Sequence, residues 1–274
     1  MRIIVPIKQV PETSSVRMDP ETGTIVREGS EAVVNPLDLY AIEAALRMKE
    51  EHGGRVDVVS MGPRRAEIAI REAIAMGCDD GYLVSDKKFG GADTWATSYV
   101  LAQVIRGMGA FHLIVAGERA TDGDTGQVGP GIASWLDLPC ATYVAHAHYR
   151  AADEPGGSGV LEADRLIEEG YQRLEVRLPA LITVVKEIAT PRLPTLAGKK
   201  RAMRADVTLV DRDGVDVEPS YIGLKGSPTK VVRIRTPKVT RGGRLVDARE
   251  GVEQAVSELV AFLRDRDLVG GSER

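Results

Sequence analysis

The loop at 117–129, with the sequence GERATDGDTGQVG, has the composition of a phosphate-binding turn. It follows the apolar run 111–116 and leads into a helical pattern around Ile132, so a buried strand is expected to deliver it to a helix start. The unpaired N–H groups of a first helical turn and the helix dipole both favour an anion there. The loop matches neither the Walker lysine pattern nor GxGxxG. A plain strand-to-helix turn, with Asp124 or Thr125 serving only as the N-cap, explains it equally well.

A second turn of this kind lies at 86–98, where Gly90 and Gly91 precede Asp93 and Thr94. It also follows an apolar run and enters a helical pattern, with carboxylate and hydroxyl side chains available as caps. In an open parallel sheet, ligands collect outside the carboxyl ends of the strands. The loops that start at Pro6, Met61, Asp86 and Gly117 are therefore expected to share one rim.

Other residue patterns indicate little catalytic chemistry. No Ser/His/Asp or Cys/His arrangement is legible. His146 and His148 could ligate a metal, but no third ligand is near them in the sequence, so an exposed polar strand face is favoured. Asp122 and Asp124 could form a general acid/base pair, although binding of ribose hydroxyls or helix capping accounts for them more simply.

The pattern of the first 140 residues predicts an α/β fold with a doubly wound parallel sheet. Apolar runs at 3–7, 56–60, 82–84 and 111–116 alternate with helical patterns at 36–51, 64–76, 93–107 and 126–136, an alternation typical of a sheet covered on both faces. Asn35 and Pro36 are typical of an N-cap and a first helical position. Gly53-Gly54 and Gly77 are typical of helix ends.

The pattern changes beyond Pro139. Residues 142–144 and 173–178 alternate polar and apolar side chains, which predicts an antiparallel extension, and 180–185 returns to a buried-strand pattern. From about residue 190, frequent prolines predict an extended C-terminal arm that ends in an amphipathic helix at about 250–265. We expect a nucleotide-binding domain at 1–190 and, at 191–274, an arm that needs a partner to bury against.

Composition sets further limits. The 274 residues are 43% hydrophobic and 4% aromatic, and the net charge of −4 argues against nucleic-acid binding. The basic run 198–204 lacks interleaved aromatics, so a solvated or partner-facing loop is favoured. Cys78 and Cys140 are expected to be small buried residues in a reducing compartment. No signal peptide or membrane-spanning stretch is legible, which predicts a soluble cytoplasmic protein without membrane insertion.

Several segments together resemble the beta subunit of electron transfer flavoproteins, over nearly the whole chain. The resemblance is carried by VPIKQVP at 5–11, NPLDLYAIE at 35–43, SMGP at 60–63, DGDTGQVGP at 122–130 and the segment 168–183. It implies an adenine nucleotide alpha hydrolase-like domain that pairs with an alpha subunit of similar fold, which also carries a mobile flavin domain. Conventional members bind AMP in the beta pocket, whereas an electron-bifurcating branch binds FAD there.

The segments 89–94, 96–98 and 226–230 resemble the bifurcating branch. FAD extends beyond the first phosphate cradle, so it would use the second turn with its glycines and hydroxyl groups. The resemblance implies a cofactor pocket formed by Pro6, Lys8, Asn35, Leu37, Asp38, Met61, Asp93, Thr94, Thr97, Gly117, Glu118, Arg119, Ala120, Thr121, Asp122, Gly123, Asp124, Thr125, Gly126, Gln127 and Val128.

The resemblance also implies partners. The segment 191–203 corresponds to the family's dehydrogenase-recognition loop, with Leu193 and Leu196 as apolar anchors, although packing on the chain's own core explains these leucines equally well. In the implied function, the beta FAD takes electrons from NADH and divides them between ferredoxin or flavodoxin and, through the alpha-subunit FAD, an acyl-CoA dehydrogenase type protein. The alternatives are a conventional AMP-binding electron carrier that serves a quinone-linked acceptor and a non-redox, universal-stress-like nucleotide-binding module.

Overall fold

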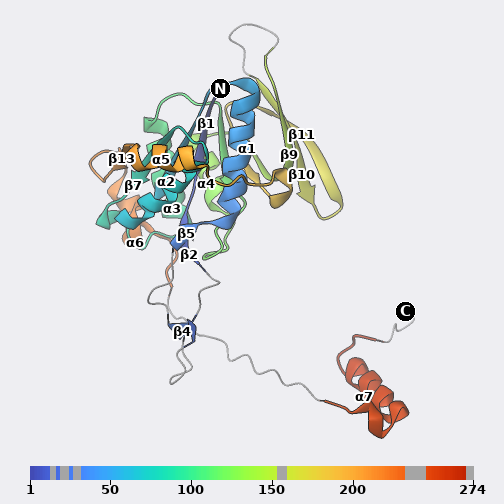
Figure 1. The fold of residues 1–274 in the computed structure, drawn as a ribbon. Helices are drawn as coiled ribbons and strands as arrows, with labels where there is room; N and C mark the ends of the chain where they lie inside the picture. Colours follow the sequence, from blue (N-terminus) through green and yellow to red (C-terminus); the bar gives the residue numbers. More distant parts are fainter. Residues whose placement is uncertain (13–16, 19–24, 27–31, 153–158, 232–244, 270–274) are drawn as a thin grey trace. The chain divides into compact units, whose positions relative to one another are not determined.

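The computed structural model of the protein describes residues 1–12, 17–18, 25–26, 32–152, 159–231 and 245–269. The chain divides into two compact units, Met1–Lys230 and Val231–Arg274. The larger unit carries the sheet (Figure 1), and the smaller one carries the helix α7 (Val252–Arg264), close to the terminal helix predicted at about 250–265.

The larger unit is built on one sheet of nine strands among the described residues. In sheet order these are β11 (Gly170–Arg177), β10 (Val160–Ile167), β9 (Cys140–Arg150), β12 (Ala180–Val184), β8 (Leu113–Gly117), β1 (Arg2–Pro6), β6 (Arg55–Met61), β7 (Asp80–Val84) and β13 (Val207–Val210). Neighbouring strands from β9 to β13 pair in parallel, whereas β9, β10 and β11 pair antiparallel. The predicted doubly wound sheet with its antiparallel extension is confirmed.

Two short antiparallel pairs stand apart from this sheet. They are β2 (Gln9–Pro11) with β5 (Ala32–Val34) and β3 (Arg17–Met18) with β4 (Ile25–Val26). The connecting helices of the larger unit are α1 (Pro36–His52), α2 (Glu67–Met76), α3 (Thr94–Gly107), α4 (Val128–Leu136), α5 (Leu196–Arg204) and α6 (Gly223–Gly226). None of the helices in the described part of the chain is both long and apolar enough to cross a bilayer.

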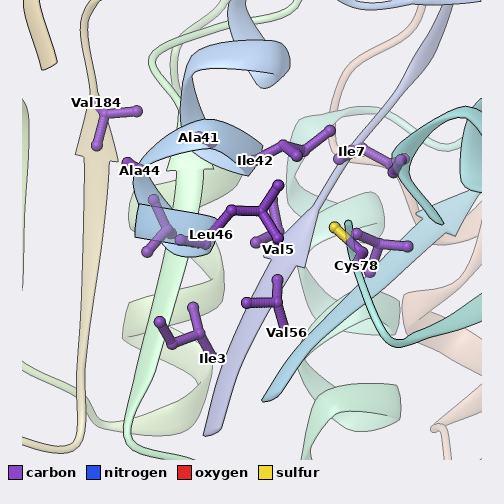
Figure 2. Packing of buried hydrophobic residues seen from close by; sticks show 14 of the residues in the cluster. Ile3, Val5, Ile7, Ala41, Ile42, Ala44, Leu46, Val56, Cys78 and Val184 are labelled. Carbon is purple, nitrogen blue, oxygen red and sulfur yellow. The ribbon is translucent and has the colours of Figure 1, made fainter. Parts of the chain in front are cut away.

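Strand β1 is buried on both of its faces, which explains its unbroken apolar sequence. Successive side chains of a strand point to opposite faces. Ile3 and Val5 accordingly belong to a cluster with Ile42 and Leu46 of α1, seen in Figure 2, whereas Ile4 belongs to a second cluster with Ile105 of α3. This two-sided packing holds the carboxyl end of β1 rigidly in place.

The helix ends and cysteines can be compared with their predictions. Gly53, at φ 71°, follows α1, and Gly77, at φ 142°, follows α2, as predicted. Both cysteines are free. Cys78 is buried, and burial raises the pKa of its thiol to about 12. Cys140 is exposed, so the expectation of a buried residue is wrong there, because the first residue of β9 lies at the end of its strand.

The segment after residue 190 is folded further than expected. Strand β13 pairs in parallel with β7, and helix α5 is fastened to α2 by the Arg71 guanidinium, which donates to the carbonyl oxygen of Ala205 at 3.1 Å. The expected domain limit at residue 190 therefore falls inside the larger unit, which ends at Lys230. The basic run 198–204 lies entirely within α5 and not in a loop.

Candidate functional site

The carboxyl ends of the parallel strands form the rim that the sequence predicts. Strands β7, β6, β1 and β8 are consecutive neighbours, so the loops that leave Val84, Met61, Pro6 and Gly117 open at one edge of the sheet. The chain moves outward from β1 to β6 and β7 and then returns to β8 on the other side of β1. Ligands of open α/β sheets bind at such a reversal of strand order.

Asn35 occupies the predicted N-cap position of α1, but its side chain has another role. Its side chain makes no capping hydrogen bond to α1. Instead, Nδ2 donates to the carbonyl oxygen of Arg119 at 2.9 Å, and Oδ1 accepts from the N–H of Thr121 at 3.1 Å. Asn35 is fully buried, so these two bonds fix the 119–121 backbone against the helix start. Asn35 therefore holds the predicted N-cap position, but its side chain ties the loop to the start of the helix and does not cap the first turn.

Asp38 lies in the first turn of α1 with its carboxylate buried. Its Oδ2 accepts from the N–H of Lys8 at 2.7 Å, which links α1 to the end of β1. Burial raises the pKa of Asp38 to about 7, while hydrogen bonds from Asn35 and Lys8 and the Lys8 charge limit the rise. This carboxyl group therefore changes charge near neutral pH at the base of the loop.

Ionisation of Asp38 should lower the stability of the protein as the pH rises. The pKa of Asp38 is about 7 in the folded state against an ordinary value of 3.8, so the stabilising contribution is complete below pH 3.8 and is lost as the pH rises through about 7. Between pH 5 and 7 the wild type should lose roughly 2–3 kcal/mol relative to Asp38→Asn, which does not titrate. Urea denaturation of both proteins measures this difference, and parallel pH curves would contradict the assignment.

The 117–127 loop approaches α1 closely at its start and is held by ion pairs further on. A Cβ on Gly117 would lie 2.4 Å from Oδ1 of Asp38, so only glycine fits there without a shift. The Lys8 ammonium meets the Asp122 carboxylate at 2.7 Å, and Arg119 meets Asp124 at 2.8 Å. Asp124 and Gly126 both have positive φ, 53° and 63°, which turns the loop sharply before α4.

Helix α4 begins at Val128, and its N-cap position is held by Gln127 without a side-chain capping bond. The suggestion that Asp124 or Thr125 caps this helix is therefore wrong. The start of α1 also lacks a side-chain cap, but Pro36 has no N–H and the Asp38 N–H already donates to the carbonyl oxygen of Asn35 at 2.9 Å, which leaves the N–H of Leu37 in that turn. In α4 the N–H groups of Val128 and Gly129 precede Pro130 and have no capping partner. Such N–H groups beside a glycine-containing loop can bind an anion.

The second turn is organised around Asp93. Its Oδ1 accepts from the N–H of Ala96 at 3.0 Å, which makes it the predicted type of N-cap for α3. Its Oδ2 accepts from the N–H and the hydroxyl of Thr229 at 2.9 and 2.7 Å, and its own N–H donates to Ser227 Oγ at 2.8 Å. Burial tends to raise the pKa of Asp93, but the hydrogen bonds outweigh it and lower the pKa overall. The 227–229 segment is thereby fixed beside the start of α3.

The first turns of α3 and α4 lie against each other. A Cβ on Gly131 of α4 would lie 2.6 Å from Oγ of Ser98 on α3. Thr94 and Thr97, which share a helical face, precede Ser98, and Val128 opens the turn that contains Gly131. The N-terminal ends of α3 and α4, which carry different hydrogen-bond donors, therefore lie side by side next to the 117–127 loop.

The predicted cofactor residues are brought to this rim. They lie at the ends of β1, β6 and β8, in the first turns of α1 and α3, and in the loop that leads to α4. Leu193 and Leu196 are elsewhere, before and at the start of α5, with 87% and 72% of their surfaces exposed. Packing on the chain's own core therefore does not explain why apolar residues stand at these two positions.

One residue near the loop has no counterpart in the sequence prediction. Tyr143 has φ 59°, which is rare for a bulky side chain, and its hydroxyl lies 3.8 Å from where a Cβ on Gly126 would be. Its N–H donates to Oγ1 of Thr183 at 3.1 Å, and the pairing of β9 with β12 is irregular there. Such an irregularity leaves no pattern in the sequence.

The two histidines lie on the antiparallel extension. His146 and His148 are exposed on alternate positions of β9. No group of three His, Cys, Asp or Glu side chains within the described ranges is arranged to hold a metal ion. Asp164 is opposite His146 on β10 and is paired with Arg173 at 2.7 Å.

Comparison with known proteins gives one consistent family. A family model described as the electron transfer flavoprotein domain matches residues 22–213. Over 270 residues the chain is 43% identical to an electron transfer flavoprotein subunit beta of Thermoanaerobacterium thermosaccharolyticum, covering 98% of this chain and 100% of the relative. It is 41% identical over 270 residues to subunit CarD of the caffeyl-CoA reductase-Etf complex of Acetobacterium woodii, with the same coverage. It is also 41% identical over 270 residues to the acryloyl-CoA reductase electron transfer subunit gamma of Anaerotignum propionicum, covering 95% and 98% of the two chains.

Proposed function

Because the chain belongs to the electron transfer flavoprotein family, as a beta subunit, we propose that it binds FAD at the carboxyl rim of its sheet and works with an alpha subunit in the cytoplasm. In this function electrons from NADH are divided between ferredoxin or flavodoxin and, through the alpha-subunit FAD, an acyl-CoA dehydrogenase type protein. The flavin supplies the redox chemistry when bound, and the protein supplies binding, orientation and electrostatics.

The packing of Ser98 against Gly131 is the observation that carries the choice of FAD over AMP. It sets the first turn of α3 beside that of α4, at the same edge as the 117–127 loop. AMP needs one phosphate cradle, whereas a dinucleotide extends from that cradle to a second group of donors. We assign that second group to the hydroxyl groups of Thr94 and Thr97, which belong to the first turn of α3.

The presence or absence of a side-chain cap suits each helix start to a different part of the cofactor. The start of α4 offers the N–H groups of Val128 and Gly129 to phosphate oxygens, and the start of α1 offers the N–H of Leu37. The start of α3 is already occupied by the Asp93 carboxylate, so it is poorly suited to a further negative charge. Its threonine hydroxyl groups suit the hydroxyl-bearing ribityl chain of a flavin, because they can both donate and accept.

The names of two relatives support an acyl-CoA type partner. One is a subunit of a caffeyl-CoA reductase complex, and the other is an electron transfer subunit of an acryloyl-CoA reductase. We extend this association to the present chain and assign partner recognition to Leu193 and Leu196, the exposed leucines beside α5.

Coupled turnover tests the proposed function. The alpha–beta heterodimer is mixed with NADH, ferredoxin and an acyl-CoA dehydrogenase with its enoyl-CoA substrate. NADH oxidation should proceed only when both acceptors are present, and each should receive half of the electrons. Full NADH oxidation with the dehydrogenase alone would contradict electron bifurcation. Transfer from a dehydrogenase to a quinone-linked acceptor, with no use of NADH, would indicate the conventional carrier.

Thr94→Val is expected to weaken flavin retention without unfolding the protein. Valine keeps the volume of threonine but removes the hydroxyl group, and the loss of one hydrogen bond should raise the flavin dissociation constant about three- to tenfold. Thr208→Val, on the exposed edge strand β13, is the matched control. Equilibrium dialysis of the heterodimers measures both variants. Equal retention in both would remove Thr94 from the binding site.

A further inference from the structure

A buried carboxylate fastens the segment that carries the exposed leucines to helix α1. The Glu43 side chain is 4% exposed, and Arg192 donates to it from Nε at 2.7 Å, from Nη2 at 3.1 Å and from its backbone N at 3.1 Å. The same guanidinium reaches Glu50, two turns further along α1, from Nη2 at 3.0 Å. The residue just before Leu193 is therefore held in both its backbone and its side chain.

The other end of the segment is fixed to α2. Arg201 donates to the carbonyl oxygen of Cys78 at 2.9 Å, and a Cβ on Gly198 would lie 2.0 Å from the carbonyl oxygen of Ala75. Thr195 caps α5 by accepting from the N–H of Gly198 at 2.9 Å. The segment is thus fixed at both ends, and the close approach of α5 to α2 limits sliding.

Between these attachments the segment presents apolar side chains to solvent. Leu193 and Leu196 are 87% and 72% exposed, and Met203 on α5 is 80% exposed. Lys199, Lys200 and Arg204 are also exposed on α5. A rigid segment that exposes large apolar groups beside positive charges suits a partner with an apolar pocket and an acidic rim, because little ordering entropy is lost on binding.

The ionisation of Glu43 is consistent with its ion pair to Arg192. Burial tends to raise the pKa of Glu43, but hydrogen bonds from Arg192 and Arg47 outweigh burial and lower it. Glu43 is therefore ionised at neutral pH, and without Arg192 this buried carboxylate would keep only Arg47, whose Nε lies 3.0 Å from Oε1. Removal of the Arg192 side chain should loosen the segment that carries Leu193 and Leu196 and should let water reach the Glu43 carboxylate.

We propose that the Glu43–Arg192 ion pair is a positioning device that holds Leu193 and Leu196 in the conformation that docks the dehydrogenase-type partner. The proposal rests on the proposed function, because it takes this segment as the partner-recognition element. Arg192 and Glu43 act through the loop and need not contact the partner's reacting atoms.

Arg192→Gln in the alpha–beta heterodimer tests the positioning role. The probe is a purified acyl-CoA dehydrogenase with its enoyl-CoA substrate, as in the coupled turnover assay. We expect the KM for the dehydrogenase to rise about tenfold, with kcat changed less than about twofold, because the variant alters docking and not the chemistry. Flavin content should be unchanged. Hydrogen exchange of the amides of residues 192–199 should become faster, and Arg192→Lys should restore part of both properties.

Two control variants make the outcomes separable. Lys49→Gln breaks the Lys49–Asp79 ion pair of 2.7 Å, which joins α1 to the region after α2, and should leave the KM unchanged. Leu196→Ala removes an anchor directly. A normal KM in Leu196→Ala would overturn recognition by this segment, and with it this part of the proposed function. A raised KM in Leu196→Ala with normal values in both Arg192 variants would overturn the positioning role alone. If Arg192→Gln fails to fold, the KM and the amide exchange rates of Arg192→Lys test the positioning role instead.

Discussion

Gly117→Ala should produce heterodimer that purifies without nucleotide in its beta pocket. The added Cβ would lie 2.4 Å from Oδ1 of Asp38, 2.9 Å from the carbonyl carbon of Leu37 and 3.0 Å from its oxygen. Contacts this short force a shift, and Leu37 belongs to the backbone of α1, which packs on the sheet. We expect a loss of about 1–3 kcal/mol in the free energy of unfolding. We also expect nucleotide affinity to fall by at least about tenfold, since the loop moves away from α1.

Gly123→Ala is the matched control for this prediction. Gly123 lies in the same loop, but a Cβ there meets nothing within 4 Å. Urea denaturation and the nucleotide content of the purified heterodimers measure both variants. Gly123→Ala should resemble the wild type in both measurements. Normal nucleotide content in Gly117→Ala would contradict the close packing of loop and helix as a requirement for binding.

Asn35→Ala has the second large expected effect. The substitution removes a fully buried side chain and leaves the carbonyl oxygen of Arg119 and the N–H of Thr121 without their partner in a partly buried contact. A lost hydrogen-bond partner costs about 1–3 kcal/mol, so we expect the stability to fall by roughly 2–4 kcal/mol in total. The 119–124 backbone should loosen, and nucleotide affinity should fall with it.

Ser98→Ala is the matched control variant for Asn35→Ala. Ser98 is also buried, but its hydroxyl donates locally to the carbonyl oxygen of Trp95, at 2.9 Å within α3. We expect its loss to cost less than about 1 kcal/mol. Thermal unfolding and hydrogen exchange of residues 117–124 measure the two proteins. If the loop amides of Asn35→Ala exchange as slowly as those of Ser98→Ala, Asn35 is not the tie described above.

The sequence predicted the parallel part of the fold because its signals are local. The apolar run of β1 follows from burial on both faces, and Gly53 and Gly77 mark the ends of α1 and α2 through their positive φ. The rim position of Pro6, Met61 and Gly117 then follows from the rule that parallel strands end at one edge.

The contacts that organise the site could not be predicted in this way, because they join distant residues. Asn35 binds backbone groups 84 and 86 residues away, and such groups leave no residue-type signal. Asp93 binds Thr229 across 136 residues. An asparagine that caps a helix with its side chain and one that binds a distant loop look alike in a sequence, so the pattern predicts the N-cap position of Asn35 but not the partners of its side chain.

The folded part of the segment after residue 190 had no clear signal for a physical reason. Helix α5 is attached by arginine side chains that donate to carbonyl oxygens, and its only buried residue is Ala202, so it lacks an apolar stripe. Strand β13 has four residues and exposes Thr208 and Leu209. Prolines on either side then dominate the pattern and indicate an extended arm.

The most direct test of the central claim is the identity and number of the nucleotides released from the purified alpha–beta heterodimer. Denaturation followed by chromatography and mass spectrometry counts FAD and AMP against protein. The rim described here, with two helix starts for the diphosphate and threonine hydroxyl groups beyond them, predicts two FAD and no AMP per heterodimer. One FAD and one AMP per heterodimer would contradict it.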